Sequence, residues 1–190
     1  MNVMQANPTA AVPSEPFLST RVESPLGPIL LVADDHALHI LEFDKEERAD
    51  REASRHEQRT GAPILPGRNA ILDQAAAEVT DYFDGTRSTF DTPITLWGTD
   101  FQCGVWNALL TIPVAETWSY KELAIAVNNP PGVRAVAQAN GANQLAIIVP
   151  CHRVIQSDGK LGGYGGKLWR KQWLLDHEKQ HFAAESGHLL

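Results

Sequence analysis

Two helix-start signals in the second half of the chain constrain its fold more than any other feature. Thr99-Asp100-Phe101-Gln102 and Ser119-Tyr120-Lys121-Glu122 each fit a capping box, in which a hydroxyl and an acidic or amide side chain each accept a hydrogen bond from the other's backbone amide. The first box opens a helix that we expect to close by Pro113. Its predicted apolar face consists of Phe101, Val105, Trp106, Leu109 and Leu110.

The second box opens a short helix through about Val127, and a turn signal follows at residues 128–132 (NNPPG). Val133 to Asn140 can form another helix. Two short helices around a tight turn have helix-turn-helix geometry, although a plain αα-hairpin fits the same pattern. A last helix is predicted from about Leu168 to Glu178.

The first half of the chain has a different character. Residues 17–44 read as short strands, with turn signals at 25–27 and 34–36. The polar stretch 45–60 fits an exposed helix or a loop, and the pattern does not separate the two. Apolar residues then recur at helical spacing from Ala70 to Phe83, with Gly85 as a stop, and residues 88–96 return to strand-like composition.

The length of 190 residues allows one large domain or two small ones. We expect a flexible lead-in at 1–16, an N-terminal α/β domain at 17–95, a second domain at 97–178 and a tail at 179–190. No apolar run approaches the roughly 20 residues of a membrane span, and the N-terminus lacks the basic and apolar regions of a secretory signal. Two cysteines exclude a disulfide framework and a four-cysteine zinc site, so we expect a cytoplasmic protein with reduced thiols.

Charge is distributed unevenly along the chain. The net charge is -7, but residues 1–96 hold eight basic against sixteen acidic residues, whereas residues 97–190 hold eight against seven. Residues 119–171 alone hold seven basic residues against two acidic ones. This segment is suited to face the phosphates of a polyanion, and a solvated basic surface fits the charges equally well.

The segment Val149-Pro150-Cys151-His152-Arg153-Val154 carries the clearest chemistry. A thiolate is the nucleophilic form of cysteine, and an adjacent imidazole can take its proton directly or through a water. Neighbouring residues on a strand point to opposite faces, so a Cys–His pair requires a turn here. Taken alone, the adjacency also fits an inert buried cysteine beside a surface histidine.

The surroundings of this segment resemble the C-terminal domain of the O6-alkylguanine-DNA alkyltransferases (methylated-DNA–protein-cysteine methyltransferases). The resemblance covers residues 98–178 and lies in GTDFQCGVWNALLTIP, TWSYKELA, VRAVAQANGANQ, IIVPCHRVIQSDGKLGGYGG and RKQWLLDHE. It extends more loosely over residues 24–44. It implies an α+β fold with a small ribonuclease-H-like N-terminal domain and a mainly helical, winged-helix-like domain that contains the helix-turn-helix.

The resemblance implies direct reversal of O6-alkylguanine damage in double-stranded DNA, with O4-alkylthymine as a further candidate lesion. Cys151 would accept the alkyl group, His152 would act as a base through a water, and Glu178 would orient the imidazole. The product is a thioether with no good leaving group, so each molecule would act once. The implied protein is a monomer that needs no cofactor and no membrane.

Further roles follow from the same resemblance. Tyr120 would hydrogen-bond a ring nitrogen of guanine, and Asn143 would hold the turn containing Pro150 and Cys151. Arg134 would fill the gap left in the base stack when the nucleotide is extruded. The main-chain carbonyls of Cys151 and Val154, together with Tyr164 and Gly165, would line the guanine pocket.

The chain departs from the family pattern at a few positions. Ala115 and Lys167 stand where glycine is common, and Gln144 where proline is common. Lys167 and Trp169 bear on the size of the pocket and on the range of substrates. Some members bind structural zinc through N-terminal cysteines and histidines, but no cysteine precedes Cys103. We therefore expect no metal, with His36, His39 and His56 at the surface.

Two other functions fit parts of the pattern. A non-catalytic lesion-binding or regulatory protein can be built on the same scaffold, but relatives of that kind replace the acceptor cysteine. A Cys–His hydrolase would need an oxyanion hole and access for water, and the sequence shows neither.

Overall fold

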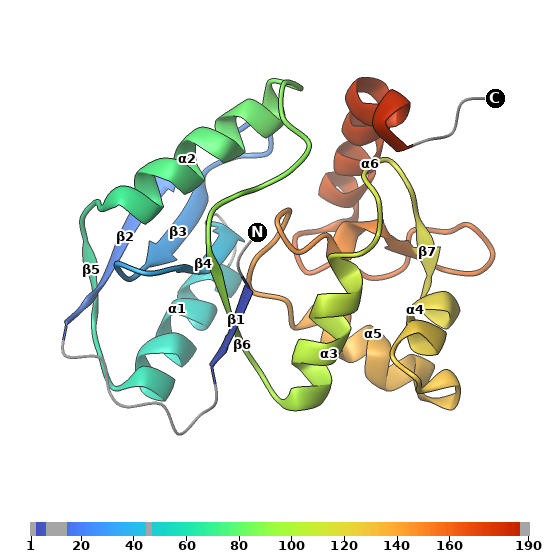
Figure 1. The fold of residues 1–190 in the computed structure, drawn as a ribbon, viewed down its shortest axis with the longest axis horizontal. Coiled ribbons are helices and arrows are strands. Elements are labelled where there is room, and N and C mark those ends of the chain that lie inside the picture. Colours follow the sequence, from blue (N-terminus) through green and yellow to red (C-terminus); the bar gives the residue numbers. More distant parts are fainter. Residues whose placement is uncertain (1–2, 7–14, 45–46, 187–190) are drawn as a thin grey trace. The chain divides into compact units, whose positions relative to one another are not determined.

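A computed structural model describes residues 3–6, 15–44 and 47–186. The chain divides into two compact units, Met1–Gly98 and Thr99–Leu190 (Figure 1). Among the described residues, no helix is both long and apolar enough to cross a membrane.

The first unit is built on a six-stranded sheet with the order β1-β6-β4-β3-β2-β5. Its strands are β1 (Val3–Ala6), β2 (Phe17–Val22), β3 (Ile29–Ala33), β4 (Leu38–Phe43), β5 (Ile64–Pro66) and β6 (Ile94–Trp97). The neighbours β2, β3 and β4 are antiparallel, as the two turn signals require. The pairs β1–β6, β4–β6 and β2–β5 are parallel.

Two helices cover the sheet on opposite sides (Figure 1). All residues of β3 and β4 are buried, which requires both faces of the sheet to be covered. On one face, Leu30 and Val32 pack against Ala49 of α1 (Glu47–Thr60). On the other lies α2 (Ala70–Phe83), which begins at the Asn69 cap and is followed by Gly85 at φ 73°. The predicted second helix and its glycine stop are confirmed, and most of the polar stretch forms a helix.

Four expectations for this unit were wrong. Residues 3–6 are not a lead-in, because they pair in parallel with β6, with Val3 opposite Ile94; residues 7–14 lie outside the described residues. His39 and His56 are buried, not at the surface. They pack with the rings of Phe17 and Trp97, and the Trp97 indole N–H donates to His39 Nδ1 at 2.7 Å.

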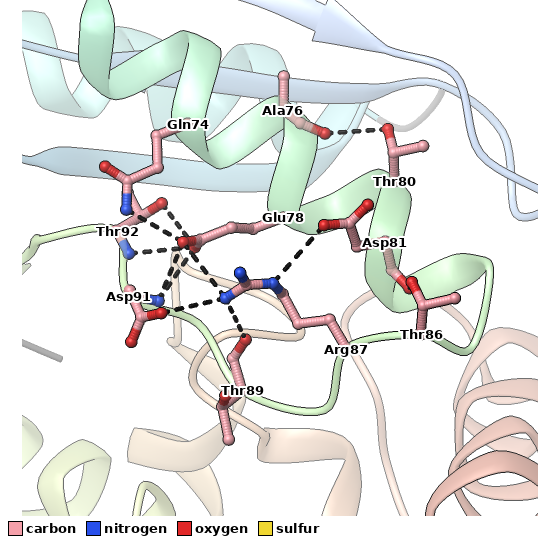
Figure 2. A network of polar contacts seen from close by, with 10 residues as sticks. All are labelled: Gln74, Ala76, Glu78, Thr80, Asp81, Thr86, Arg87, Thr89, Asp91 and Thr92. Atoms are coloured by element: carbon pink, nitrogen blue, oxygen red, sulfur yellow. Dashed lines mark hydrogen bonds and ion pairs between the residues drawn. The ribbon is translucent and has the colours of Figure 1, made fainter.

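Most of the strand expected at residues 88–96 is also missing, since β6 starts only at Ile94. The Glu78 carboxylate on α2 accepts hydrogen bonds from the backbone amides of Asp91 and Thr92 and from the Thr92 hydroxyl (Figure 2). These amides are thereby engaged by a side chain and not by a neighbouring strand. A buried carboxylate holds the segment as a loop.

The second unit is mainly helical. Its elements are α3 (Asp100–Leu109), β7 (Trp118–Ser119), α4 (Tyr120–Ala126), η1 (Pro130–Gly132), α5 (Val133–Gly141), η2 (Cys151–Arg153), β8 (Val154–Ile155), α6 (Leu168–Phe182) and η3 (Ala183–Ser186). Both predicted capping boxes are present, at Thr99 and at Ser119. Helices α4 and α5 flank the turn at η1 and both pack on α3, and the Trp106 indole N–H donates to the carbonyl of Ala139.

Two details of this unit differ from expectation. Phe101 is 38% exposed and lies off the buried face of α3, which instead includes Cys103. The chain does not become a tail at residue 179, because α6 continues to Phe182, whose ring is buried. Residues 187–190 lie outside the described part of the chain.

Candidate active site

The predicted turn at the thiol is confirmed. The apolar run 145–149 is buried and folds back on itself, with the Val149 amide donating to the carbonyl of Leu145. Pro150 then leads into the 3-10 turn η2, which begins at Cys151. The Cys151 side chain is nearly enclosed, with 7% of the residue exposed.

Two asparagines, Asn140 on α5 and Asn143 just after it, hold this turn. The Asn143 amide nitrogen donates to the carbonyl of Val149 at 2.8 Å and lies 3.2 Å from the Cys151 Sγ. The Asn140 amide nitrogen lies 3.4 Å from the carbonyl oxygen of Cys151. The first contact is the geometry that the sequence suggested for Asn143, whereas Asn140 had no expected role.

His152 and Glu178 form a buried pair, with 2.7 Å between His152 Nε2 and Glu178 Oε1. Burial lowers the pKa of His152 despite the opposing effect of the carboxylate. Burial alone would raise the pKa of Glu178, but His152 and Arg153 hold it well below its usual range. The pair is therefore a neutral imidazole beside a carboxylate, and Nε2 carries the hydrogen that it donates to Oε1.

This tautomer leaves His152 Nδ1 as a lone-pair acceptor. Nδ1 is buried and has no hydrogen-bond partner among the described residues. A base whose second nitrogen is fixed by a carboxylate is the arrangement that activates a nucleophile in hydrolytic triads.

Arg153 is a residue of this site that sequence reasoning treated only as a positive charge. Its guanidinium donates to both oxygens of Glu178 at 2.9 Å and to the carbonyl of Ile112 at 2.7 Å. The backbone amide of Ala115 also donates to Glu178. Glu178 is thus fixed by an arginine and an amide as well as by the imidazole.

Lys171 is a second residue that sequence reasoning treated only as a positive charge. It is fully buried on α6, and its ammonium donates to the carbonyls of Val154, at 2.6 Å, and of Leu161. Burial lowers its pKa to about 8, while the charge of Cys151 acts in the opposite direction. Lys171 therefore ties the loop after η2 to α6.

Tyr120, at the start of α4, contacts the same loop. Its hydroxyl donates to the carbonyl of Gly163 at 3.3 Å, and a Cβ on Gly162 would lie 3.0 Å from the Tyr120 ring. Burial, and then the charge of Cys151, raises the pKa of the Tyr120 hydroxyl. Tyr120 is accordingly a neutral hydrogen-bond donor at physiological pH.

The remaining predicted residues lie around these groups. Val154 follows the turn directly, Tyr164 is half-buried in the loop held by Lys171, and Gly165 beside it is exposed. Arg134 is exposed near the start of α5 and makes no ion pair within the described part of the chain.

Two matches to family models cover most of the chain. Residues 18–96 match the "6-O-methylguanine DNA methyltransferase, ribonuclease-like domain", and residues 100–180 match the "6-O-methylguanine DNA methyltransferase, DNA binding domain". The chain belongs to the 6-O-methylguanine DNA methyltransferase family. The expected order of a ribonuclease-like domain followed by a helix-turn-helix domain is confirmed.

Individual relatives of this family align along nearly their full length. The methylated-DNA–protein-cysteine methyltransferase of Methanosarcina barkeri is 42% identical, over 84% of this chain and 96% of its own. That of Mycobacterium tuberculosis is 43% identical, over 86% and 93%. The crystal structure of Mycobacterium tuberculosis OGT in complex with DNA matches with a TM-score of 0.73 and 40% identity, over 86% of this chain and 94% of that one.

Two departures from the family pattern coincide with unusual backbone. Ala115 has φ 62° and Lys167 has φ 73°, both in the left-handed region that glycine adopts without strain. Ala115 donates its amide to Glu178, and Lys167 precedes α6. Glycine is therefore the residue that both conformations favour.

No group of three or more His, Cys, Asp or Glu side chains within the described ranges is arranged to hold a metal ion. That the protein works without a metal remains a prediction.

Proposed function

We propose that this protein repairs DNA by transferring the alkyl group of O6-alkylguanine to the sulfur of Cys151. The observation that carries the proposal is the buried series Cys151, His152 and Glu178, in which His152 Nδ1 is left as an acceptor. The family membership supports the same reaction.

In the proposed reaction, the thiol proton of Cys151 passes through a water to His152 Nδ1. The thiolate attacks the alkyl carbon, a C–S bond forms and the bond from that carbon to O6 breaks. The electron pair of the broken bond goes to guanine, whose ring takes up a proton from water, and His152 returns the thiol proton to water, so that the net change moves one proton from the thiol to guanine. Tyr120 donates a hydrogen bond to the ring as its negative charge develops, which the raised pKa of its hydroxyl supports.

The chemistry of the product implies that each protein molecule acts only once. A thioether at Cys151 has no good leaving group, so the carbon–sulfur bond persists. We propose no cofactor and no regeneration step.

DNA is the proposed partner, through the second unit. A duplex base cannot reach a thiol as enclosed as that of Cys151, so the nucleotide must be extruded at a cost of a few kcal/mol. Arg134 is an exposed cation on the second helix of the helix-turn-helix and is the proposed group that fills the vacated space. Tyr164 and Gly165 are the proposed pocket lining.

The test is intact-protein mass spectrometry after incubation with a duplex that contains one O6-methylguanine. We expect one methyl group per protein, located on Cys151, and none on a Cys151→Ala variant that still binds the duplex. Binding without transfer by the parent protein would point to a lesion-binding protein. Repeated demethylation without modification of the protein would point to a hydrolase.

Arg134 is tested with the same readout on two substrates. Arg134→Ala is expected to slow repair of duplex DNA while leaving the reaction of free O6-benzylguanine nearly unchanged, because the free base needs no extrusion. If both rates fall equally, the variant has damaged the pocket and the stack-filling role is wrong. A uniform loss of affinity for all DNA would make Arg134 a phosphate contact.

A further inference from the structure

Ile147 has a backbone conformation that an isoleucine rarely adopts. Its φ is 71°, in the left-handed region, where a branched side chain crowds the backbone. The Ile148 amide donates to the carbonyl of Ala146 at 2.8 Å, so the chain makes a γ-turn centred on Ile147. A γ-turn with a positive central φ is the rare and strained form of this turn. Strain of this kind persists only where the surrounding structure holds it.

This γ-turn lies in the middle of the run that leads to the thiol. Asn143 closes the run from both ends, because its Oδ1 accepts from the amide of Leu145 at 3.0 Å and its amide nitrogen donates to the carbonyl of Val149 at 2.8 Å. The same nitrogen lies 3.2 Å from the Cys151 Sγ. The position of the Val149 carbonyl, and with it the hydrogen bond to the sulfur, therefore depends on the conformation of Ile147.

Burial of the Ile147 side chain opposes the strain. The residue is 1% exposed, and an aliphatic side chain of this size is stabilised when it is removed from water. If Ile147 returned to a negative φ, the rotation of the backbone would redirect its Cβ, and the side chain would leave this buried position. The side chain thus holds the backbone in a conformation that an isoleucine would otherwise avoid.

We propose that Ile147 is a positioning residue for the nucleophile, whose buried side chain holds the strained γ-turn and so keeps Asn143 in place to donate a hydrogen bond to the Cys151 Sγ. A hydrogen bond to the thiolate favours the charged form and lowers the pKa of the thiol. Loss of the turn should therefore raise that pKa. The inference rests on the proposed function only in taking Cys151 as the nucleophile.

The test compares alanine and glycine at Ile147 and at Ile148. Ile148 is the matched control, because it is 3% exposed in the same run and is not among the described residues with a positive φ. The readout is the rate at which iodoacetamide modifies Cys151 as a function of pH, whose midpoint reports the pKa of the thiol without any DNA. Peptide mass spectrometry separates this modification from that of Cys103, the other buried thiol.

The two positions should respond differently to alanine. Ile147→Ala should shift the midpoint upward by about one pH unit, the equivalent of a lost hydrogen bond to a charged group, whereas Ile148→Ala should leave it near the parent value. Ile147→Gly should lie closer to the parent protein than Ile147→Ala, because glycine adopts a positive φ without strain. A residue that only fills the core would show the opposite order, since glycine removes one more methyl group.

Three outcomes would overturn the inference. The first is a midpoint that is unchanged in Ile147→Ala, the second an equal shift in Ile148→Ala, and the third a larger shift in Ile147→Gly than in Ile147→Ala. If Ile147→Ala does not fold, urea denaturation of Ile147→Gly and Ile148→Gly decides. Relief of strain predicts the higher urea midpoint for Ile147→Gly, and the reverse order would contradict the proposal.

Methyl transfer separates this inference from the proposed function. Ile147→Ala should slow transfer from O6-methylguanine in a duplex by up to about 100-fold, the cost of a displaced reacting group. If the parent protein transfers no methyl group while the iodoacetamide profiles follow the expected order, the proposed function fails and the positioning role of Ile147 stands. If transfer occurs but the profiles of the Ile147 and Ile148 variants coincide, the positioning role alone is wrong.

Discussion

Glu78 and Glu178 are buried carboxylates that both lie on helices and both fix a neighbouring segment, one in each unit. Glu78 accepts from two backbone amides and a threonine hydroxyl (Figure 2). Glu178 accepts from one backbone amide, an arginine and an imidazole. In the first unit, the partners of the carboxylate are backbone and side-chain groups that take no part in a reaction. In the second unit, one partner is His152, whose other ring nitrogen, Nδ1, has no hydrogen-bond partner among the described residues.

The comparison shows that burial of a carboxylate does not by itself indicate a catalytic role. What distinguishes Glu178 is that one of its partners can change its protonation state. The carboxylate of Glu178 fixes the tautomer of His152, and in this tautomer Nδ1 can accept the proton of a thiol.

The largest expected effect is therefore a difference in the rate of alkyl transfer between variants of the two carboxylates. Glu178→Gln should slow alkyl transfer by about 10²–10⁴, the usual contribution of a positioned base, because a glutamine can donate to His152 Nε2 and place the hydrogen on Nδ1. Glu78→Gln should leave the rate unchanged. The measurement is single-turnover transfer from a duplex that contains one O6-methylguanine.

His152→Ala should slow transfer to a similar extent as Glu178→Gln, and the double variant should be little slower than either, since both residues act on one proton. If His152→Ala transfers at the parent rate, the imidazole is not the base.

The second expected effect concerns stability. Glu78→Ala leaves the amide and hydroxyl of Thr92 buried without their acceptor, so we expect a loss of about 2–4 kcal/mol in the free energy of unfolding. Urea denaturation at neutral pH measures this loss. Gln74→Ala, which removes one donor to the same carboxylate, is the milder control. An unchanged unfolding free energy in Glu78→Ala would show that loop 86–93 does not depend on this carboxylate.

The sequence predicted the parts of this molecule that depend on near neighbours. Thr99 with Gln102 and Ser119 with Glu122 are three residues apart, and their capping boxes were read correctly. Gly85 stops α2 because a residue with φ 73° is needed directly after the helix. The turn at Cys151 followed from the need to bring adjacent side chains together.

Contacts between distant residues could not be predicted in this way. The hydrogen bonds of Glu78 with Thr92 and of Arg153 with Glu178 join residues that are 14 and 25 positions apart in the sequence. These contacts depend on the tertiary structure. The pairing of β1 with β6 joins residues about ninety positions apart, and no local pattern marks it. Asn140 carried a signal that was not used: it stands four residues after Val136, which is buried on the same face of α5.

The buried histidines extend the comparison of the two units to the dependence of stability on pH. His56 in the first unit and His152 in the second both have pKa values lowered by burial, but only His152 has a carboxylate partner. The pKa of His56 falls to about 3, mainly because of burial, and the charge of Arg59 lowers it further while Asp34 only partly opposes these effects. Neither ring nitrogen of His56 has a hydrogen-bond partner among the described residues.

The sign of the effect follows from these values. An unfolded histidine has a pKa near 6.5 and binds a proton more readily than folded His56, so its stabilising contribution is complete above about pH 6.5 and is lost as the pH falls toward 3. At about pH 4.5 the loss should be about 2–3 kcal/mol. His56→Leu should remove that part of the acid sensitivity, whereas the exposed His36→Gln should not. The check is urea denaturation of the three proteins at pH 7 and pH 4.5; equal losses in all three would refute the assignment to His56.

The smallest expected effect distinguishes how the two carboxylates are held. Asp91 and Thr92 give their amides to Glu78 without a left-handed backbone, whereas Ala115 gives its amide to Glu178 at φ 62°. An alanine in that region is strained by about 1 kcal/mol relative to glycine, although glycine also gains freedom in the unfolded chain. Ala115→Gly should therefore raise the free energy of unfolding by up to about 1 kcal/mol without changing the transfer rate, because the amide that Glu178 uses is retained. Ala137→Gly, within α5, is the matched control and should lower stability by about 0.5–1 kcal/mol. If Ala115→Gly instead slows transfer, the strained alanine is needed to hold Glu178 against His152, and the two carboxylates differ in their backbone support as well as in their partners.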